Sequence, residues 1–110
     1  MRIVDYDTCV KLPIGTLYCE TEPCVFGEIK IKDETINDEK DWFLQSFQNN
    51  IEYENGLNES YNKLLEGKEV DLDFDTTERD GMFDYDRKFA IYSQKDIQDM
   101  INKLQSILTK

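Results

Sequence analysis

Histidine is absent from this chain of 110 residues, and this absence narrows the chemistry available to it. Without histidine the chain lacks the usual general base for serine and cysteine nucleophiles and the commonest nitrogen ligand of zinc. The three cysteines, Cys9, Cys19 and Cys24, are odd in number and have no C-x-x-C spacing. We therefore expect free thiols in a reducing cytoplasm rather than a disulfide framework or a zinc site.

Glycine, proline and long apolar runs are also scarce. The five glycines are isolated from one another, so no glycine-rich phosphate-binding loop is present. The first residues, MRIVDYDTC, lack the apolar core of a signal peptide, and no apolar run approaches membrane-spanning length. The sequence therefore predicts a cytoplasmic protein that does not associate with membranes.

Basic residues are few beside the acidic ones. The chain has 24 acids and 13 basic residues, which gives a formal net charge of −11. Such a charge repels nucleic acid and anionic membranes and attracts basic partners, so we expect no direct nucleic-acid binding. Because 39% of the residues are hydrophobic, the chain is expected to fold, and its length favours a single domain over residues 1–110.

Local patterns predict an α+β fold: a mainly antiparallel β-sheet, an amphipathic C-terminal helix packed on one face, and one or two short helices. Strands are expected over residues 2–4, 16–19, 24–32 and 89–92, a short helical turn after Asp5 or Asp7, and a helix over 57–65 that ends at Gly67. Residues 33–41 are predicted as a loop in which Asn37 caps a helix. Residues 42–51 fit either that helix, with Phe43, Phe47 and Ile51 inward, or a strand with Trp42, Leu44 and Ser46 on one face.

The C-terminal segment has the clearest helical pattern. Ser93 is an N-cap with Asp96 three residues later, which is close to a capping box. Apolar residues then recur at helical spacing over residues 94–108, and we expect Ile97, Ile101, Leu104 and Leu108 to be buried. On that expectation Leu104→Ala would cost about 2–5 kcal/mol.

Residues 69–86, EVDLDFDTTERDGMFDYD, alternate between apolar and acidic side chains. This pattern predicts a hairpin in which Val70, Leu72 and Phe74 lie on one face and three aspartates on the other. The turn is expected at Asp80-Gly81, because glycine accepts the positive φ of many tight turns, and the second strand at residues 82–86.

Two kinds of metal-dependent site, a calcium-binding loop and a nuclease motif, partly match the sequence. Asp71, Asp73 and Asp75 alternate like calcium ligands, but Thr76 and Met82 occupy the positions that need Gly and Glu in an EF-hand loop. Glu28-Ile29-Lys30 matches the E-x-K of magnesium-dependent nucleases, with Glu20 or Glu22 as the upstream acid. That short motif occurs often by chance, and substrate binding would need a basic groove. We therefore expect neither a metal site nor a cofactor.

The acidic hairpin is the predicted contact surface for a partner. Aspartate is a poor strand former, and neighbouring carboxylates on one strand repel each other, so the alternation costs stability. One interpretation needs no partner: the carboxylates form a solvated face, or they prevent aggregation through an edge strand. The functional one is a face that imitates the phosphates of nucleic acid, and the residues assigned to it are Asp71, Asp73, Asp75, Glu78, Asp80, Asp84, Tyr85 and Asp86. An aromatic surface around Trp42, Phe43 and Tyr53 is the alternative contact surface.

Two segments carry a wider resemblance, KLPIGTLYCETEPCVFGEIKIK and RDGMFDYDRKFAIYSQKDIQDMINKL. With them the chain resembles small acidic proteins of phages and prophages of Gram-positive bacteria. The resemblance implies an inhibitor of host defence, a category that includes anti-CRISPR proteins that mimic DNA. For a phage-encoded protein, the compartment would be the host cytoplasm.

The charge and the resemblance lead to one hypothesis and two alternatives. The hypothesis is a non-enzymatic inhibitor that occupies a basic nucleic-acid-binding surface. The target that we expect first is a CRISPR effector nuclease. The first alternative is an immunity-type protein that neutralises a basic toxin nuclease through the same electrostatics. The second alternative is a metal-dependent nuclease or nucleotide enzyme.

Overall fold

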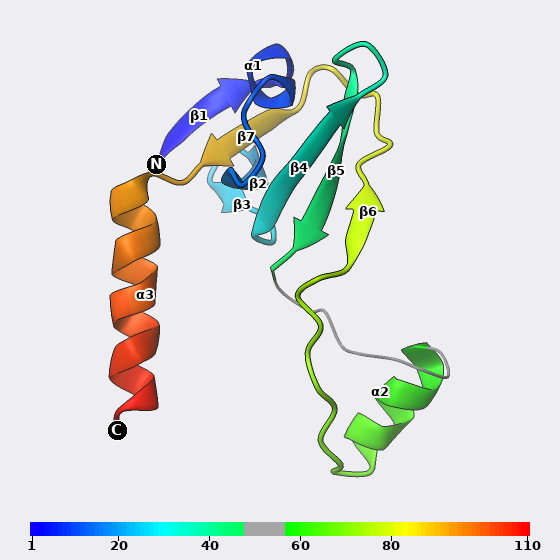
Figure 1. The fold of residues 1–110 in the computed structure, drawn as a ribbon, viewed down its shortest axis with the longest axis vertical. Coiled ribbons are helices and arrows are strands. Elements are labelled where there is room, and N and C mark those ends of the chain that lie inside the picture. Colours follow the sequence, from blue (N-terminus) through cyan, green and yellow to red (C-terminus); the bar gives the residue numbers. More distant parts are fainter. Residues whose placement is uncertain (48–56) are drawn as a thin grey trace.

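The computed structural model describes residues 1–47 and 57–110, and confirms the α+β class (Figure 1). Its strands are β1 (Arg2–Asp5), β2 (Leu17–Glu22), β3 (Val25–Phe26), β4 (Lys30–Ile36), β5 (Asp41–Ser46), β6 (Thr77–Arg79) and β7 (Lys88–Ile91). Its helices are α1 (Tyr6–Val10), α2 (Leu57–Leu65) and α3 (Gln94–Leu108). Within the described residues the strands form one antiparallel sheet in the order β1-β7-β2-β4-β5-β6, and β3 pairs with β2.

The core lies where α1 covers the aromatic residues of the sheet. The side chain of Asp5 accepts a hydrogen bond from the Thr8 N–H at 2.9 Å and so caps α1, as predicted. The buried core residues are Tyr6, Cys9, Val10, Tyr18, Trp42, Leu44, Phe89 and Ile91. Strand β7 lies between β1 and β2 and contributes Phe89, Ala90 and Ile91 to the interior, which confirms the predicted interior strand.

The expectation of one strand over residues 24–32 is wrong. Residues 21–26 instead form a tight hairpin, with Thr21 opposite Phe26 and a left-handed φ of 65° at Cys24. Strand β4 then runs on to Ile36, through the first four residues of the predicted loop, and a turn with left-handed residues at Asn37, Asp38 and Glu39 follows it. Asn37 therefore caps no helix, because the chain turns there directly into β5.

Of the two alternatives for residues 42–51, the strand is confirmed in the described part. Trp42, Leu44 and Ser46 are buried on one face of β5, whereas Phe43 and Phe47 are not. Ile51 lies outside the described residues. Helix α2 forms as predicted, and Gly67 follows it with a φ of 82°.

Helix α3 has the predicted limits and cap, but its expected packing on the sheet is wrong. Ser93 Oγ accepts from the Asp96 N–H, and Asp96 Oδ2 accepts from the Ser93 N–H, which completes the capping box. No residue of α3 is buried, and Ile101, Leu104 and Leu108 are 51%, 58% and 79% exposed. The aromatic face of the sheet is already covered by α1, so α3 does not pack on it.

The outline of the molecule reflects this arrangement. In Figure 1, α3 and α2 both extend away from the sheet. The radius of gyration is 16.0 Å, whereas a compact chain of this length has about 13 Å. No helix in the described ranges has the length and apolar character that crossing a membrane requires.

We expect truncation of Phe89 to unfold the domain far more readily than truncation of Leu104. Phe89→Ala opens a cavity in the aromatic core and should cost about 3–5 kcal/mol. Leu104→Ala removes an exposed side chain and should change the free energy of unfolding by no more than about 0.5 kcal/mol. Urea denaturation of dilute protein checks both values, and similar losses for the two variants would mean that α3 is packed after all.

Candidate functional site

The acidic stretch of residues 69–86 does not form the predicted hairpin. Within it only β6 is a strand, and β6 pairs with β5 rather than with residues 82–86: Phe43 lies opposite Arg79 and Gln45 opposite Thr77. Before β6, Asp73 accepts from the Asp75 N–H at 2.9 Å and from Thr76 Oγ1 at 3.1 Å. Such local side-chain hydrogen bonds compete with a sheet ladder, which explains why the first predicted strand is missing.

The second predicted strand is replaced by a loop that Arg87 holds against the core. Its Nε–H donates to the carbonyl oxygen of Asp84 at 3.2 Å, and its Nη2–H donates to the carbonyl of Met82 at 2.5 Å. The remaining donors reach Asp80, at 3.1 Å from Nη1 to Oδ1 and 2.7 Å from Nη2 to Oδ2. Arg87 therefore fixes the path of residues 80–84 and leaves them no freedom to form a ladder.

The guanidinium of Arg87 lies inside the aromatic core. Its central carbon lies 5.4 Å from the ring centre of Tyr6, 5.8 Å from that of Trp42 and 5.2 Å from that of Phe89. The side chains of Arg87 and Asp80 are each only 5% exposed. Burial would lower the pKa of Arg87, but the hydrogen bonds and charge of Asp80 outweigh burial and raise it. Arg87 therefore keeps its charge although it is buried, and its guanidinium lies against three aromatic rings.

A second buried carboxylate anchors the same segment from β5. Asp41 is fully buried, pairs with Arg79, and accepts hydrogen bonds from the N–H groups of Gly81, at 3.0 Å, and Trp42, at 2.9 Å. Burial alone would raise the pKa of Asp41, but these hydrogen bonds together hold it below its usual value. Gly81 has the positive φ expected of it, 64°, and its N–H points to this carboxylate.

These contacts divide the predicted partner-binding residues into two groups. The prediction that Asp80 contacts a partner is wrong, because Asp80 is buried in its ion pair with Arg87. Asp73 is half-buried, whereas the others face solvent: Asp71, Asp75, Glu78, Asp84, Tyr85 and Asp86. Glu78 accepts from Ser46 Oγ at 3.3 Å, and the Tyr85 ring packs edge-on against Tyr6 at 4.9 Å. None of the ion pairs in the described ranges involves Asp71, Asp75 or Asp86.

The apolar residues of the stretch are exposed beside these carboxylates rather than buried beneath them. Leu72, Phe74, Met82 and Phe83 all face solvent. The rings of Phe74 and Phe47 are 5.6 Å apart, and Arg79 lies over Phe83 at 5.9 Å. We call this combined surface of residues 69–86, without Asp80, the acidic segment. It offers a partner both carboxylates and aromatic faces.

Sequence reasoning missed three buried charged residues: Asp41, Arg87 and Lys32. The Lys32 ammonium donates to Thr35 Oγ1 at 2.6 Å and to the carbonyl of Asp33 at 3.2 Å, and burial lowers its pKa. The strand pattern had placed Lys32 on the solvent face. A signal for Arg87 was available, since it directly follows the acidic stretch and precedes the apolar β7.

The described residues offer little for catalysis. No group of three or more histidine, cysteine, aspartate or glutamate residues in residues 1–47 and 57–110 comes together in a way that could hold a metal ion. Cys9 and Cys19 are buried and Cys24 is exposed, all as free thiols. Burial raises the pKa of Cys9 to about 12, so this thiol is protonated at neutral pH and is a poor nucleophile.

Comparison of the chain with protein-family models, with curated proteins and with solved structures finds no match. The assignment of a function therefore depends on the charge and geometry described above.

We expect Asp80→Asn to destabilise the domain by about 3–5 kcal/mol, because it leaves the buried Arg87 charge with only the half-exposed Glu20 carboxylate, 3.8 Å away, as a counterion. Asp86→Asn is the matched control: it removes the same charge from an exposed side chain and should change stability by no more than about 0.5 kcal/mol. Urea denaturation followed by Trp42 fluorescence measures both. Equal effects would show that the Arg87 pair is not buried in solution.

Proposed function

We propose that this protein is a non-enzymatic inhibitor whose acidic segment occupies a basic, nucleic-acid-binding surface of another protein. The observation that carries the proposal is a concentration of exposed carboxylates that form no ion pair among the described residues, on a segment whose residues 79–84 are tied to the core by Arg87 and Asp41. A segment fixed in advance loses less conformational entropy on binding than a free acidic tail would.

The electrostatics favour a basic surface over any other partner. The whole chain has a formal net charge of −11, so its electric field attracts cationic surfaces at long range. The acidic segment would supply the close contacts with such a surface. Of the three alternating aspartates, Asp71 and Asp75 face solvent, whereas Asp73 is half-buried and held locally by Asp75 and Thr76.

The exposed aromatic rings add a second kind of contact. Arginine side chains that bind phosphate also stack on aromatic faces, and Phe74 and Phe83 lie within the acidic segment. A surface of carboxylates interleaved with rings therefore suits an arginine-rich site better than a lysine-rich one.

A CRISPR effector nuclease is the first target to test. Its arginine-lined site reads a short DNA motif beside the target sequence and is strongly basic. This choice depends on the resemblance to small acidic phage proteins, whereas the basic character of the target depends on the charge alone. An immunity-type protein that neutralises a basic toxin nuclease would use the same acidic segment.

The test replaces Asp71, Asp73 and Asp75 together by asparagine, which keeps their shape and the hydrogen bond that Asp73 accepts from the Asp75 N–H while removing three charges. We expect inhibition of DNA binding by the effector to weaken at least about tenfold, since a close charge pair across an interface couples by about 1.5 kcal/mol or more. Folding should be unaffected or slightly more stable, because mutual repulsion is relieved. Competition binding at two salt concentrations measures the effect, and rising salt should weaken the wild-type complex.

The matched control changes Asp7 and two exposed glutamates, Glu22 and Glu34, to their amides. It alters the net charge equally but leaves the acidic segment intact, so it should inhibit nearly as well as the wild type. If both triple variants weaken inhibition equally, only the overall charge matters. If neither does, the acidic segment is a solvated face and the contact lies elsewhere, with the exposed or half-buried aromatic residues Phe43 and Phe47 as the next surface to test. Tyr53, which belonged to the predicted aromatic alternative, lies outside the described residues.

The enzymatic alternative makes a different prediction about divalent ions. A dedicated site would bind Ca²⁺, Mg²⁺ or Mn²⁺ at micromolar concentration and raise the melting temperature. We expect little change at millimolar concentration and no defined stoichiometry by calorimetric titration. Micromolar binding with a fixed stoichiometry would contradict the inhibitor proposal and favour a metal-dependent nuclease or nucleotide enzyme.

A further inference from the structure

Helix α3 carries an apolar stripe that nothing in the described part of the chain covers. Ile97, Ile101, Leu104 and Leu108 follow one another at spacings of four, three and four residues, and Met100 and Ile107 widen the stripe on one side. Isolated helices of this length are marginal in water and depend on packing of their apolar face. We therefore expect the stripe to pack against an apolar surface of another molecule.

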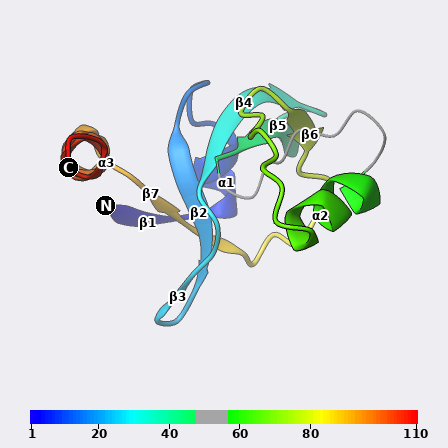
Figure 2. The same cartoon turned by 90° about the horizontal axis from the view of Figure 1, so that it is seen from below.

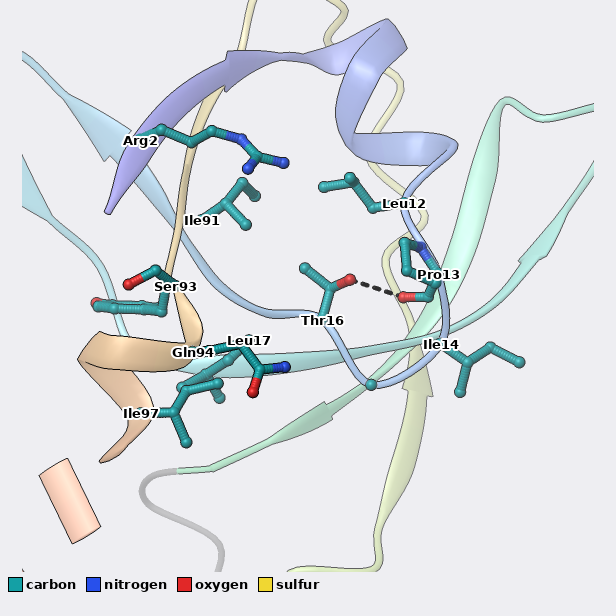
Figure 3. A pocket seen from close by; sticks show the side chains of 12 residues that line it. Arg2, Leu12, Pro13, Ile14, Thr16, Leu17, Ile91, Ser93, Gln94 and Ile97 are labelled. Atoms are coloured by element: carbon teal, nitrogen blue, oxygen red, sulfur yellow. Dashed lines mark hydrogen bonds between the residues drawn. The ribbon is translucent and has the colours of Figure 1, made fainter. Parts of the chain in front are cut away.

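A pocket lies at the N-terminal end of the same stripe (Figure 3). It has a volume of about 460 Å³ and lies between α3, β7 and the loop that precedes β2. Its apolar lining includes Leu12, Ile14, Leu17 and Ile97, and Ile97 also begins the stripe. The apolar surface is therefore continuous from the pocket to the end of α3.

We propose that α3 pairs with α3 of a second copy of this chain in an antiparallel dimer, in which Leu108 of each copy lies at the pocket of the other. The alternation of four and three residues is the spacing of a two-helix seam. An antiparallel pair about a two-fold axis places Ile97 opposite Leu108 and Ile101 opposite Leu104, so one stripe complements itself. The proposal is independent of the target of the acidic segment.

Charge favours the antiparallel direction. Both aspartates in the first half of α3 are already paired, Asp96 with the N-terminal amine of Met1 and Asp99 with Lys95, each at 2.7 Å. The second half carries Lys103, followed by Lys110, and no acidic residue. Antiparallel pairing keeps the two Lys110 ends apart and aligns the helix dipoles favourably. Parallel pairing would place the two sheet domains side by side. These domains would repel each other, because each chain has a formal net charge of −11.

The size of the contact explains why the pocket is needed. The 15 residues of α3 span about 22 Å, and contact between two such helices alone falls short of the roughly 1,200 Å² at the lower end of standard interfaces. Insertion of Leu108 beside Ile14 and Leu17 adds apolar area at both ends. We therefore expect a weak dimer with micromolar affinity. Figure 2 shows α3 on the opposite side of the sheet from β6 and α2, so the dimer leaves both acidic segments free.

Sedimentation equilibrium from micromolar to near-millimolar concentration tests the association. The wild type should pass from monomer to dimer, and Leu104→Glu should remain monomeric over the whole range. Ser106→Glu, on the opposite side of the same helix, is the matched control with the same charge change and should dimerise like the wild type. Because α3 contributes no buried residue, both variants should keep the thermal unfolding of the sheet domain. A monomeric wild type, or equal loss in both variants, would overturn the proposal.

The pocket and the helix direction have separate tests. Ile14→Ser changes a pocket residue outside α3 and should weaken dimerisation about fivefold to tenfold, a loss in line with losing part of one buried apolar side chain per site. An unchanged dissociation constant would rule out insertion of Leu108. The direction is tested with an equimolar mixture of Ile101→Cys and Leu104→Cys, each with Cys24→Ser to remove the exposed thiol. Mild oxidation should link the two variants mainly to each other, because antiparallel pairing places these two positions opposite each other. Links mainly between identical copies would mean parallel pairing and contradict the proposal.

Discussion

The buried ion pair between Arg87 and Asp80 is the constraint on which the rest of this structure depends. It brings a charged side chain from the residue just before β7 into the aromatic core, where it contacts rings of α1, β5 and β7. The same guanidinium binds two backbone carbonyls of the loop before it, so sheet, core and loop share one set of hydrogen bonds. A buried pair of this kind contributes more to a unique arrangement than to net stability, because desolvation offsets much of its attraction.

This arrangement also organises the surface charge. The domain uses Arg79 and Arg87, two of its few basic side chains, to neutralise Asp41 and Asp80 beneath the acidic segment. Among the described residues, the exposed carboxylates Asp71, Asp75 and Asp86 form no ion pair. Helix α3 carries an exposed apolar surface on the other side of the sheet. In our two proposals, the charged surface contacts a foreign partner and the apolar surface contacts a second copy of this chain.

The candidate site was only partly predictable from sequence. The concentration of acids in residues 69–86 was evident, and most of them are exposed. Period-two alternation, however, cannot distinguish a hairpin from an extended segment whose hydrogen bonds are local, and Asp73 forms such bonds with Asp75 and Thr76. Nor could the alternation show that Asp80 differs from its neighbours, because that depends on Arg87 reaching it across the core.

The sequence by itself determined the features that arise within a few residues of the chain. These are the cap of α1 by Asp5, the capping box and limits of α3, the stop of α2 at Gly67, and the apolar interior strand β7. Tertiary structure alone decided which strand β6 pairs with, which charges are buried, and whether the apolar face of α3 is covered. Caps and periodicity follow from local backbone geometry, whereas burial and pairing depend on which distant residues already fill the core.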